Sequence, residues 1–400
     1  MSRIYHFSPQ QTWGCVMCGK CCGRDWPVPV DREERQRISE MDLPDIKIPK
    51  SKWFQNSFIA KKNGKCIFST CDGKRCIIHE KYGLDVKALA CRLYPLDIHA
   101  WEDGSITASL RYDCPAVAHG TENNISSAIV KIDQMADEIA RYRRDSAPFY
   151  NKELHPGLDR LREITEAYIA IFNCRDIPLP LRFLGCSELL TFHKQKENSS
   201  DILEAEEFAD DAKNLMNRSV ENLELMLTHA KAAAHGVMIG FRYQLLSYLR
   251  NDNGLNLFSR IRRLKKHLDF MLGGADLKLG DKMLSPLLQA LPPEKDAFEP
   301  YMRWLNGKLK SLHFCGGISG ITFEEGMQYL LLSFPAISVI SSAIAEGEKI
   351  TRSDVANALI LLDYSFLRTK LYNTGYLKKG AAILTNQENY VTLLKSCIIL

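Results

Sequence analysis

"CVMCGKCC", residues 15–22, places four cysteines within eight positions of the chain. The first three repeat a C-x-x-C spacing and the fourth follows the third directly; they are Cys15, Cys18, Cys21 and Cys22. Thiolates are soft, negatively charged donors that suit zinc and iron–sulfur centres, and close spacing lets one loop supply several ligands. Gly19 and Gly23 can adopt the unusual backbone angles that such a loop requires. The stretch therefore predicts a metal-ligand loop.

The remaining cysteines are unevenly distributed. Nine of the 13 fall in the first 114 residues, and the later five of these are Cys66, Cys71, Cys76, Cys91 and Cys114. The other four, Cys174, Cys186, Cys315 and Cys397, are scattered in apolar helical sequence, where a free cysteine usually packs as a small hydrophobe. In a reducing compartment, clustered cysteines indicate metal ligands or redox chemistry rather than a disulfide framework. The sequence therefore predicts a metal centre within residues 15–114.

The composition is that of an ordinary globular protein, with 46% hydrophobic and 25% charged residues. The first residues, MSRIYHFSPQQTWG, lack the apolar core and small-residue cleavage site of a signal peptide. The longest apolar stretches are shorter than the ~20 residues that span a bilayer. We therefore expect a cytoplasmic protein that binds no membrane. The net charge of +4 is small and its basic residues are interleaved with acidic ones, which argues against a nucleic-acid partner.

Two kinds of sequence divide the chain near residue 120. Residues 1–118 are rich in Gly, Pro, Cys and short apolar runs, which are typical of short strands and turns around a cluster. From residue 121, apolar residues recur at three- and four-residue steps, the period of a helix with one buried face. This period runs through 125–145, 158–173, 201–234, 237–250, 255–271, 296–312, 323–346 and 352–372. The predicted fold is α+β and mostly α, with a cysteine-cluster metal-binding domain at 1–120 and a helical domain at 121–400.

The cysteine-bearing stretches also resemble those of a known family. CVMCGKCC, followed by GKCIF, KRCIIHEKYGLDVKALACRLYP and RYDCPAV, is similar to the YkgJ-type cysteine-cluster proteins, which are described as zinc- or iron-chelating. Within that family the closest likeness is to the flagellin lysine-N-methylase group, the FliB-like proteins. The likeness covers about residues 13–117, and the helical remainder carries no motif of the group.

The resemblance implies an iron–sulfur enzyme, with a [4Fe-4S] cluster, that methylates the ε-amine of lysines using S-adenosylmethionine. Its substrate would be a protein such as flagellin, and no residue can be assigned to catalysis. The cysteines that the resemblance assigns to metal are Cys15, Cys18, Cys21, Cys22, Cys66, Cys76, Cys91 and Cys114. Cys71 is additional, and its role is open. Zinc in place of iron stays an alternative.

Several features leave the chemistry open. A [4Fe-4S] cluster takes up to four protein thiolates, so eight cysteines imply either a second site, such as zinc, or thiols with structural or redox roles. Cys21 and Cys22 are adjacent, and a strand would send their side chains to opposite faces. The spacing differs from the C-x-x-x-C-x-x-C run of radical S-adenosylmethionine enzymes, and no Gly-rich turn follows a first strand. FCGGISGITFEEG at 314–326 is interpreted as an inter-helix loop.

Two residues near the cysteines are further candidates. Arg92 can bind the carboxylate of S-adenosylmethionine, because a guanidinium fork suits planar anions; a salt bridge that orders the loop is the alternative. His79 lies three residues after Cys76 and can complete a Cys/His zinc site. The charge runs DREERQR at 31–37 and RIRRLKKH at 260–267 are expected to be solvated helix faces.

Two other classes of function compete with the enzyme. One is a non-catalytic zinc- or iron-binding module whose helical domain binds a protein. The other is a thiol redox protein or metal carrier, in which C-x-x-C pairs exchange disulfides or pass metal on. An iron–sulfur enzyme is brown when purified without oxygen, whereas a zinc module is colourless and unfolds with chelator.

Overall fold

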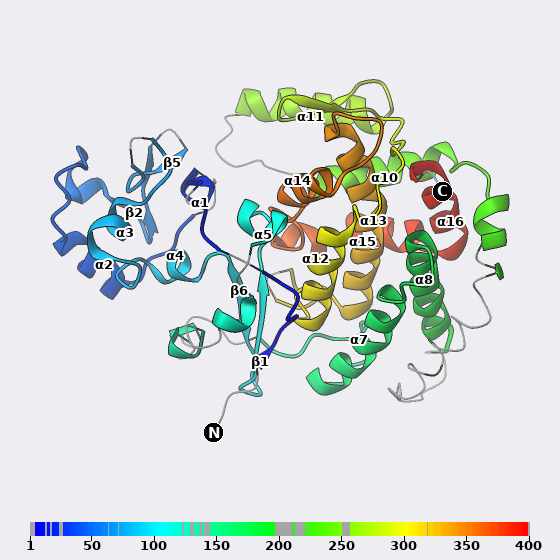
Figure 1. Cartoon of the computed structure of the whole chain (residues 1–400), viewed down its shortest axis with the longest axis horizontal. Coiled ribbons are helices and arrows are strands. Elements are labelled where there is room, and N and C mark those ends of the chain that lie inside the picture. Colours follow the sequence, from blue (N-terminus) through cyan, green and yellow to red (C-terminus); the bar gives the residue numbers. More distant parts are fainter. Residues whose placement is uncertain are drawn as a thin grey trace.

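The computed structural model describes most of the chain. The described residues are all of 1–400 except 1–4, 13, 17, 24–26, 63, 71, 122–123, 129–131, 136–137, 140–144, 197–209, 211, 213–220, 223, 250–256, 318 and 399–400. Figure 1 shows a small amino-terminal lobe on the left and a larger body of helices on the right. The prediction of a mostly α, α+β fold is confirmed.

The amino-terminal lobe is built from short elements joined by turns, as its composition predicts. Its strands are β2 (Phe54–Gln55), β3 (Phe58–Ile59), β4 (Lys61–Lys62) and β5 (Lys65–Cys66), and its helices are α1 (Lys20–Gly23), α2 (Arg32–Glu40), α3 (Ile77–Tyr82) and α4 (Leu89–Leu93). β2 pairs with β3 and β4 with β5, both antiparallel. Their small core includes Ile38, Trp53 and Phe68. Such short elements bury little apolar surface, so metal ligands are a natural source of additional stability.

α2 begins where the charge run predicts a helix. The Asp31 side chain accepts a hydrogen bond from the Glu34 backbone N–H, and the Glu34 carboxylate accepts one from the Asp31 N–H. This reciprocal capping box satisfies two amide groups that the first helical turn leaves unpaired. Glu34 is buried rather than solvated, so the expectation of a fully solvated face is wrong at this position.

A three-stranded sheet stands between the lobe and the helices (Figure 1). β6 (Leu96–Ala100) pairs antiparallel with β7 (Ile106–Leu110), and β7 pairs in parallel with β1 (Tyr5–His6). Leu96 of β6 and the buried apolar side chains of β7 belong to the same core as the helical body. α5 (Pro115–His119) continues this join by packing against α14 (Arg352–Leu362). The domain boundary near residue 120 stays a prediction.

The helical body surrounds one long apolar helix, α13 (Phe323–Ile344). The other helices of the body are α7 (Leu158–Phe172), α8 (Leu179–Lys196), α10 (His235–Tyr248), α11 (Leu257–Met271), α12 (Glu299–Lys310), α14, α15 (Gly375–Leu384) and α16 (Gln387–Cys397). Of these, α8, α14, α15 and α16 make the most contacts with α13. Among the described residues, α13 alone is long and apolar enough to cross a bilayer, but 83% of its most apolar window is buried inside the protein. It is therefore placed as the core helix of the body (Figure 1).

The helical body departs from the sequence expectations in several places, and the helix expected at 352–372 ends at Leu362. The stretch near residue 280 forms a hairpin of β8 (Leu277–Leu279) and β9 (Lys282–Leu284). α8 was not predicted, because it buries consecutive residues such as Phe183 and Leu184 and so lacks a one-sided period. α15 and α16 were not predicted either. Most of the expected helix at 201–234 lies outside the described residues.

Candidate metal centre

One cavity of about 640 Å³ brings the predicted metal ligands together. All eight line it: Cys15, Cys18, Cys21, Cys22, Cys66, Cys76, Cys91 and Cys114. They arrive from separate segments of the chain: the stretch before α1, α1 itself, β5, the turn before α3, α4 and the turn before α5. Cys71 lies outside the described residues. The described cysteines are all free thiols.

The first ligand loop depends on Gly19. Its φ is +66°, which favours glycine, and a Cβ built there would lie 1.8 Å from the Gly73 carbonyl oxygen. The Gly19 carbonyl in turn accepts the backbone N–H groups of Cys22 and Gly23. The close approach of two backbones therefore holds the cysteine turn against the loop that precedes Cys76. Gly23 has ordinary backbone angles and open space around it, so the expectation that it serves an unusual conformation is wrong.

Cys21 and Cys22 lie on a helical turn and not on a strand. Their Sγ atoms are 4.0 Å apart, and both side chains line the cavity. The argument that adjacent residues point to opposite faces applies to strands and fails here, because neighbours on a helix differ in direction by only ~100°.

The next three ligands are held by backbone pairing and one buried carboxylate. Cys66 pairs with Lys61 across the β4–β5 ladder, and Cys76 forms a bridge with Ser69 before α3 begins. Cys91 lies in α4, whose first residue, Leu89, donates its backbone N–H to the Glu34 carboxylate at 2.6 Å. Glu34 therefore ties the start of the Cys91 helix to α2. The charge run at 31–37 was expected to be solvated, so the sequence did not indicate that Glu34 would be a buried hydrogen-bond acceptor.

Cys114 reaches the cavity from the other side. It is the N-terminal cap residue of α5, and its carbonyl accepts the N–H groups of Val117 and Ala118. Because α5 packs on α14, Cys114 is fixed to the helical body.

Basic side chains line the same cavity. Lys87 lies among the thiols, and its backbone is fixed at both ends: its N–H donates to Leu84 and its carbonyl accepts the Arg92 Nε at 3.1 Å. Arg92 also lines the cavity and forms an ion pair with Glu138. His79 is at the wall as well, whereas His99 and His119 are not. Lys87 was missed by sequence reasoning because only the fold places it beside the cysteines.

The thiols differ in their electrostatic surroundings. The hydrogen bond from Cys22 lowers the pKa of Cys21 to about 6 and raises that of Cys22. Burial raises the pKa of Cys66 to about 11 and that of Cys91 to about 12. Burial alone would lower the pKa of Lys87, but the nearby thiols, Cys91 foremost, raise it. A bare thiolate is thus costly at the buried positions, and a bound cation would offset that cost.

The donor set fits a polynuclear group better than one preformed zinc ion. Two ligands of a tetrahedral zinc, each about 2.3 Å from the metal, are about 3.8 Å apart. Among the described side chains, the only three metal-binding atoms within 4.8 Å of one another belong to a different cluster, so no three thiols are that close. The volume of the cavity is also many times the ~30 Å³ that one water molecule occupies in the liquid, so it has room for a group larger than a single ion.

That different cluster consists of Asp97, His99 and His313, and its polar atoms are engaged by protein. Arg368 pairs with the Asp97 carboxylate, and burial, with help from His99, holds the pKa of His313 well below its usual range. Trp101 donates to the Thr107 hydroxyl, which shares a hydrogen bond with His313 Nε2 at 3.2 Å, and His313 Nδ1 shares one with the Ser109 hydroxyl at 2.8 Å. A neutral histidine with both nitrogens bonded is a structural group.

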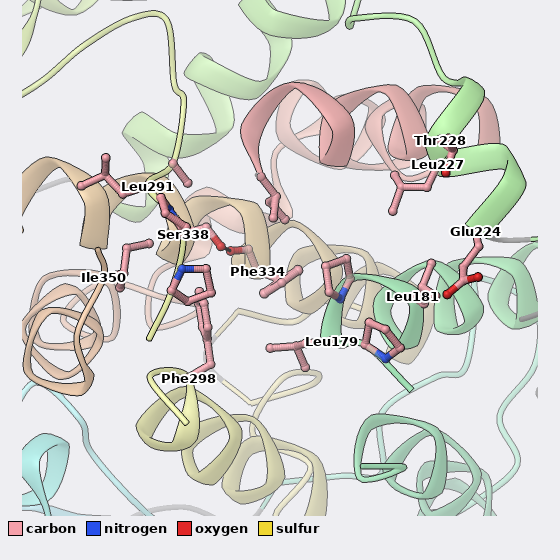
Figure 2. A pocket seen from close by; sticks show the side chains of 16 residues that line it. Leu179, Leu181, Glu224, Leu227, Thr228, Leu291, Phe298, Phe334, Ser338 and Ile350 are labelled. Atoms are coloured by element: carbon pink, nitrogen blue, oxygen red, sulfur yellow. Dashed lines mark hydrogen bonds between the residues drawn. The ribbon is translucent and has the colours of Figure 1, made fainter. Parts of the chain in front are cut away.

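A second cavity, of about 540 Å³, lies in the helical body (Figure 2). Leu179, Phe298 and Phe334 point into it, and Glu224 and Thr228 lie at one end. It contains no cysteine or histidine. The first part of the stretch 314–326 lies in the loop that joins α12 to α13 and packs Gly316 on Pro148, whereas Phe323 begins α13, so the expected inter-helix loop is shorter than the stretch.

Comparison with known proteins supports the metal-binding assignment. The family that matches residues 14–115 is described as "CxxCxxCC: Putative zinc- or iron-chelating domain". Neither a curated protein nor a solved structure matches the chain. The matched range contains all eight cysteines that line the cavity. Residues 14–115, about a quarter of the chain, are therefore similar to the CxxCxxCC family of zinc- or iron-chelating domains.

Proposed function

We propose that this protein is an iron–sulfur protein-lysine N-methyltransferase that uses S-adenosylmethionine and acts on lysine ε-amines of a protein such as flagellin. The observation that supports metal binding is that eight cysteine side chains line one cavity. The resemblance to the flagellin lysine-N-methylase group supplies the reaction. The cavity volume of about 640 Å³ falls within the ~300–1,000 Å³ of small-molecule sites, so it has room for an organic cofactor beside a cluster.

In this proposal the eight cysteines hold the metal and the basic residues of the wall act on anions. A [4Fe-4S] cluster would supply an electron to a radical reaction, or serve as a structural element in a polar one. Lys87 balances the negative charge of the thiolates. Arg92 uses its Nε and Nη2 for the protein, and among the described residues no partner bonds its Nη1, which can take the cofactor's carboxylate.

The test is methyl transfer by protein prepared without oxygen. Flagellin is incubated with the loaded protein and S-adenosylmethionine carrying a labelled methyl group, and modified lysines are located by mass spectrometry. We expect label on lysine with the wild type and with Cys174→Ser, a cysteine outside the cavity, and none with Cys76→Ser. Absence of label from protein that holds iron and sulfide would reject the reaction while leaving metal binding intact.

The second candidate, a non-catalytic zinc- or iron-binding module, is favoured by the small core of the amino-terminal lobe. A lobe with such short strands gains stability from metal ligation. If this function is correct, the protein contains zinc or iron, chelator unfolds the lobe, and the loaded protein transfers no methyl group.

A further inference from the structure

The second cavity, in the helical body, has walls that are fixed by backbone pairing. The loop before α12 forms one wall: Pro293 bridges Ile350, and Ile350 donates its N–H to the Pro292 carbonyl at 2.9 Å. The same loop is tied to α13, because the Leu291 N–H donates to the Ser342 hydroxyl at 2.9 Å. Proline fixes its own φ, and four prolines stand in the lining: Pro178, Pro180, Pro292 and Pro293. These contacts hold the loops in place, so the cavity of about 540 Å³ is preformed.

Apolar side chains line this cavity except at one end. Leu179, Phe298 and Phe334 point into it (Figure 2). Away from that end, the single polar side chain among the described lining residues is Ser338. Its hydroxyl donates to the Phe334 carbonyl at 2.9 Å and is therefore satisfied within its own helix. A ligand that covers these walls gains free energy by removing apolar surface from water.

Glu224 and Thr228 form the polar end of the cavity (Figure 2). They stand four residues apart in a helical stretch, so both side chains lie on one face of it. Glu224 is the one charged side chain of the lining, and neither side chain makes a hydrogen bond or ion pair with a residue in the described part of the chain. Both are exposed. This end therefore favours a ligand group that is positively charged and donates hydrogen bonds.

This cavity is separate from the metal centre, because none of its lining residues lines the cysteine cavity. Its volume falls within the ~300–1,000 Å³ of small-molecule sites. Protein interiors leave few voids larger than a water molecule. A preformed apolar cavity of this volume, with polar groups at one end, is typical of a ligand site.

We propose that this cavity binds an apolar amine, with a hydrocarbon chain or ring system along the apolar walls and an ammonium group beside the Glu224 carboxylate. Burial of the apolar body supplies the affinity. The carboxylate sets the preference for a cation over a neutral or anionic molecule of the same length. The site goes beyond the proposed function, because it requires neither the metal nor methyl transfer.

Three probes that share a ten-carbon chain and differ in their head group test the proposal: decylamine, decanol and decanoate. The full-length protein is first loaded with N-phenyl-1-naphthylamine, a neutral fluorophore that brightens in apolar sites, and each probe is then titrated in below its micelle concentration. We expect decylamine to displace the fluorophore at the lowest concentration, decanol at a higher one and decanoate at the highest. Decylamine should also raise the unfolding temperature, because it binds the folded state.

Two variants assign the binding to this cavity. Leu179→Trp fills the cavity from a partly buried position and should abolish fluorophore binding. Glu224→Gln keeps the apolar walls and should weaken decylamine binding about two- to fivefold, the range of an exposed ion pair, while decanol binds as in the wild type. Glu221→Gln changes an exposed carboxylate outside the lining, so this matched control should leave all three probes unaffected.

Absence of fluorophore binding to the wild type, or equal binding to Leu179→Trp and the wild type, would overturn the site. Equal affinities for decylamine and decanoate in the wild type would overturn the preference for an amine. So would equal decylamine affinity in Glu224→Gln and Glu221→Gln. Because Glu224 is exposed, its substitution leaves the core intact and decides the class of ligand even where Leu179→Trp does not fold.

Discussion

Substitution of Gly19 by alanine tests whether the first ligand loop is held by the contact with Gly73. A Cβ at position 19 would lie 1.8 Å from the Gly73 carbonyl oxygen and 2.7 Å from the Lys74 Cα. Real Cβ atoms essentially never approach another heavy atom closer than 3.0 Å, so the two backbones must separate by at least 1.2 Å (3.0 minus 1.8). The movement displaces the turn that carries Cys21 and Cys22.

The energetic cost has two parts. A non-glycine residue at φ +66° costs about 1–3 kcal/mol, and forcing extra volume into a packed contact costs about 1–3 kcal/mol more. We therefore expect Gly19→Ala to lose about 2–6 kcal/mol of folding and metal-binding free energy combined, which lowers metal affinity at least tenfold. Gly23→Ala is the matched control, because Gly23 has open space around it and ordinary backbone angles.

The assay is competition for metal against a coloured chelator, together with thermal unfolding of the loaded protein. Gly23→Ala should stay within about 0.5 kcal/mol of the wild type. Equal metal affinity and equal unfolding temperature in Gly19→Ala and Gly23→Ala would refute the claim that backbone contact positions the ligand loop.

Three further predictions concern groups around the site. Glu34→Gln weakens the hydrogen bond from the Leu89 N–H, so it should lower the free energy of unfolding by about 1–3 kcal/mol and reduce the metal content. The control Glu33→Gln changes an exposed carboxylate and should change neither quantity. Identical metal content in the two variants would contradict the positioning role of Glu34. The folded-state pKa of His313 lies below its unfolded value, so its contribution to stability is complete above about pH 6.5 and is lost as the pH falls. The free energy of unfolding measured in urea should therefore fall, below that pH, by up to about 1.4 kcal/mol per pH unit more in the wild type than in His313→Gln. Parallel pH profiles of the two proteins would contradict this prediction. Asp363→Asn leaves the buried Lys308 without its ion pair, while Arg368 keeps Asp97. Chemical denaturation should therefore show a loss of about 3–5 kcal/mol of unfolding free energy, against less than about 1 kcal/mol for Lys282→Gln, which breaks an exposed ion pair. Comparable losses in the two variants would refute the buried network.

The sequence was sufficient to predict the mostly helical fold and to identify Gly19, because both depend on local patterns. A cysteine loop with a glycine at its centre indicates an unusual backbone angle whatever surrounds it. The side chains of the expected ligand set also lie together on one cavity.

The remaining parts depend on contacts between distant segments. Glu34 looked like one of several solvated charges, and only the position of α4 makes it a buried acceptor. Lys87 carries no motif, yet the fold places it among the thiols. Two roles were open for Arg92, a ligand of the cofactor and a salt bridge that orders the loop. The structure contains an ion pair between Arg92 and Glu138, and binding of the cofactor by Arg92 stays a prediction. The separate attachment of Cys114 to the helical body could not be read from spacing, because α5 and α14 are far apart in sequence.

The central claim, an iron–sulfur centre on the cysteine cavity, is tested most directly by metal and sulfide analysis of protein purified without oxygen. Iron, acid-labile sulfide and zinc are measured on the same sample as its absorption spectrum. We predict about four irons and four sulfides per chain and a broad visible band, all absent from Cys76→Ser. Zinc without iron or sulfide in anaerobically prepared wild type would contradict the claim.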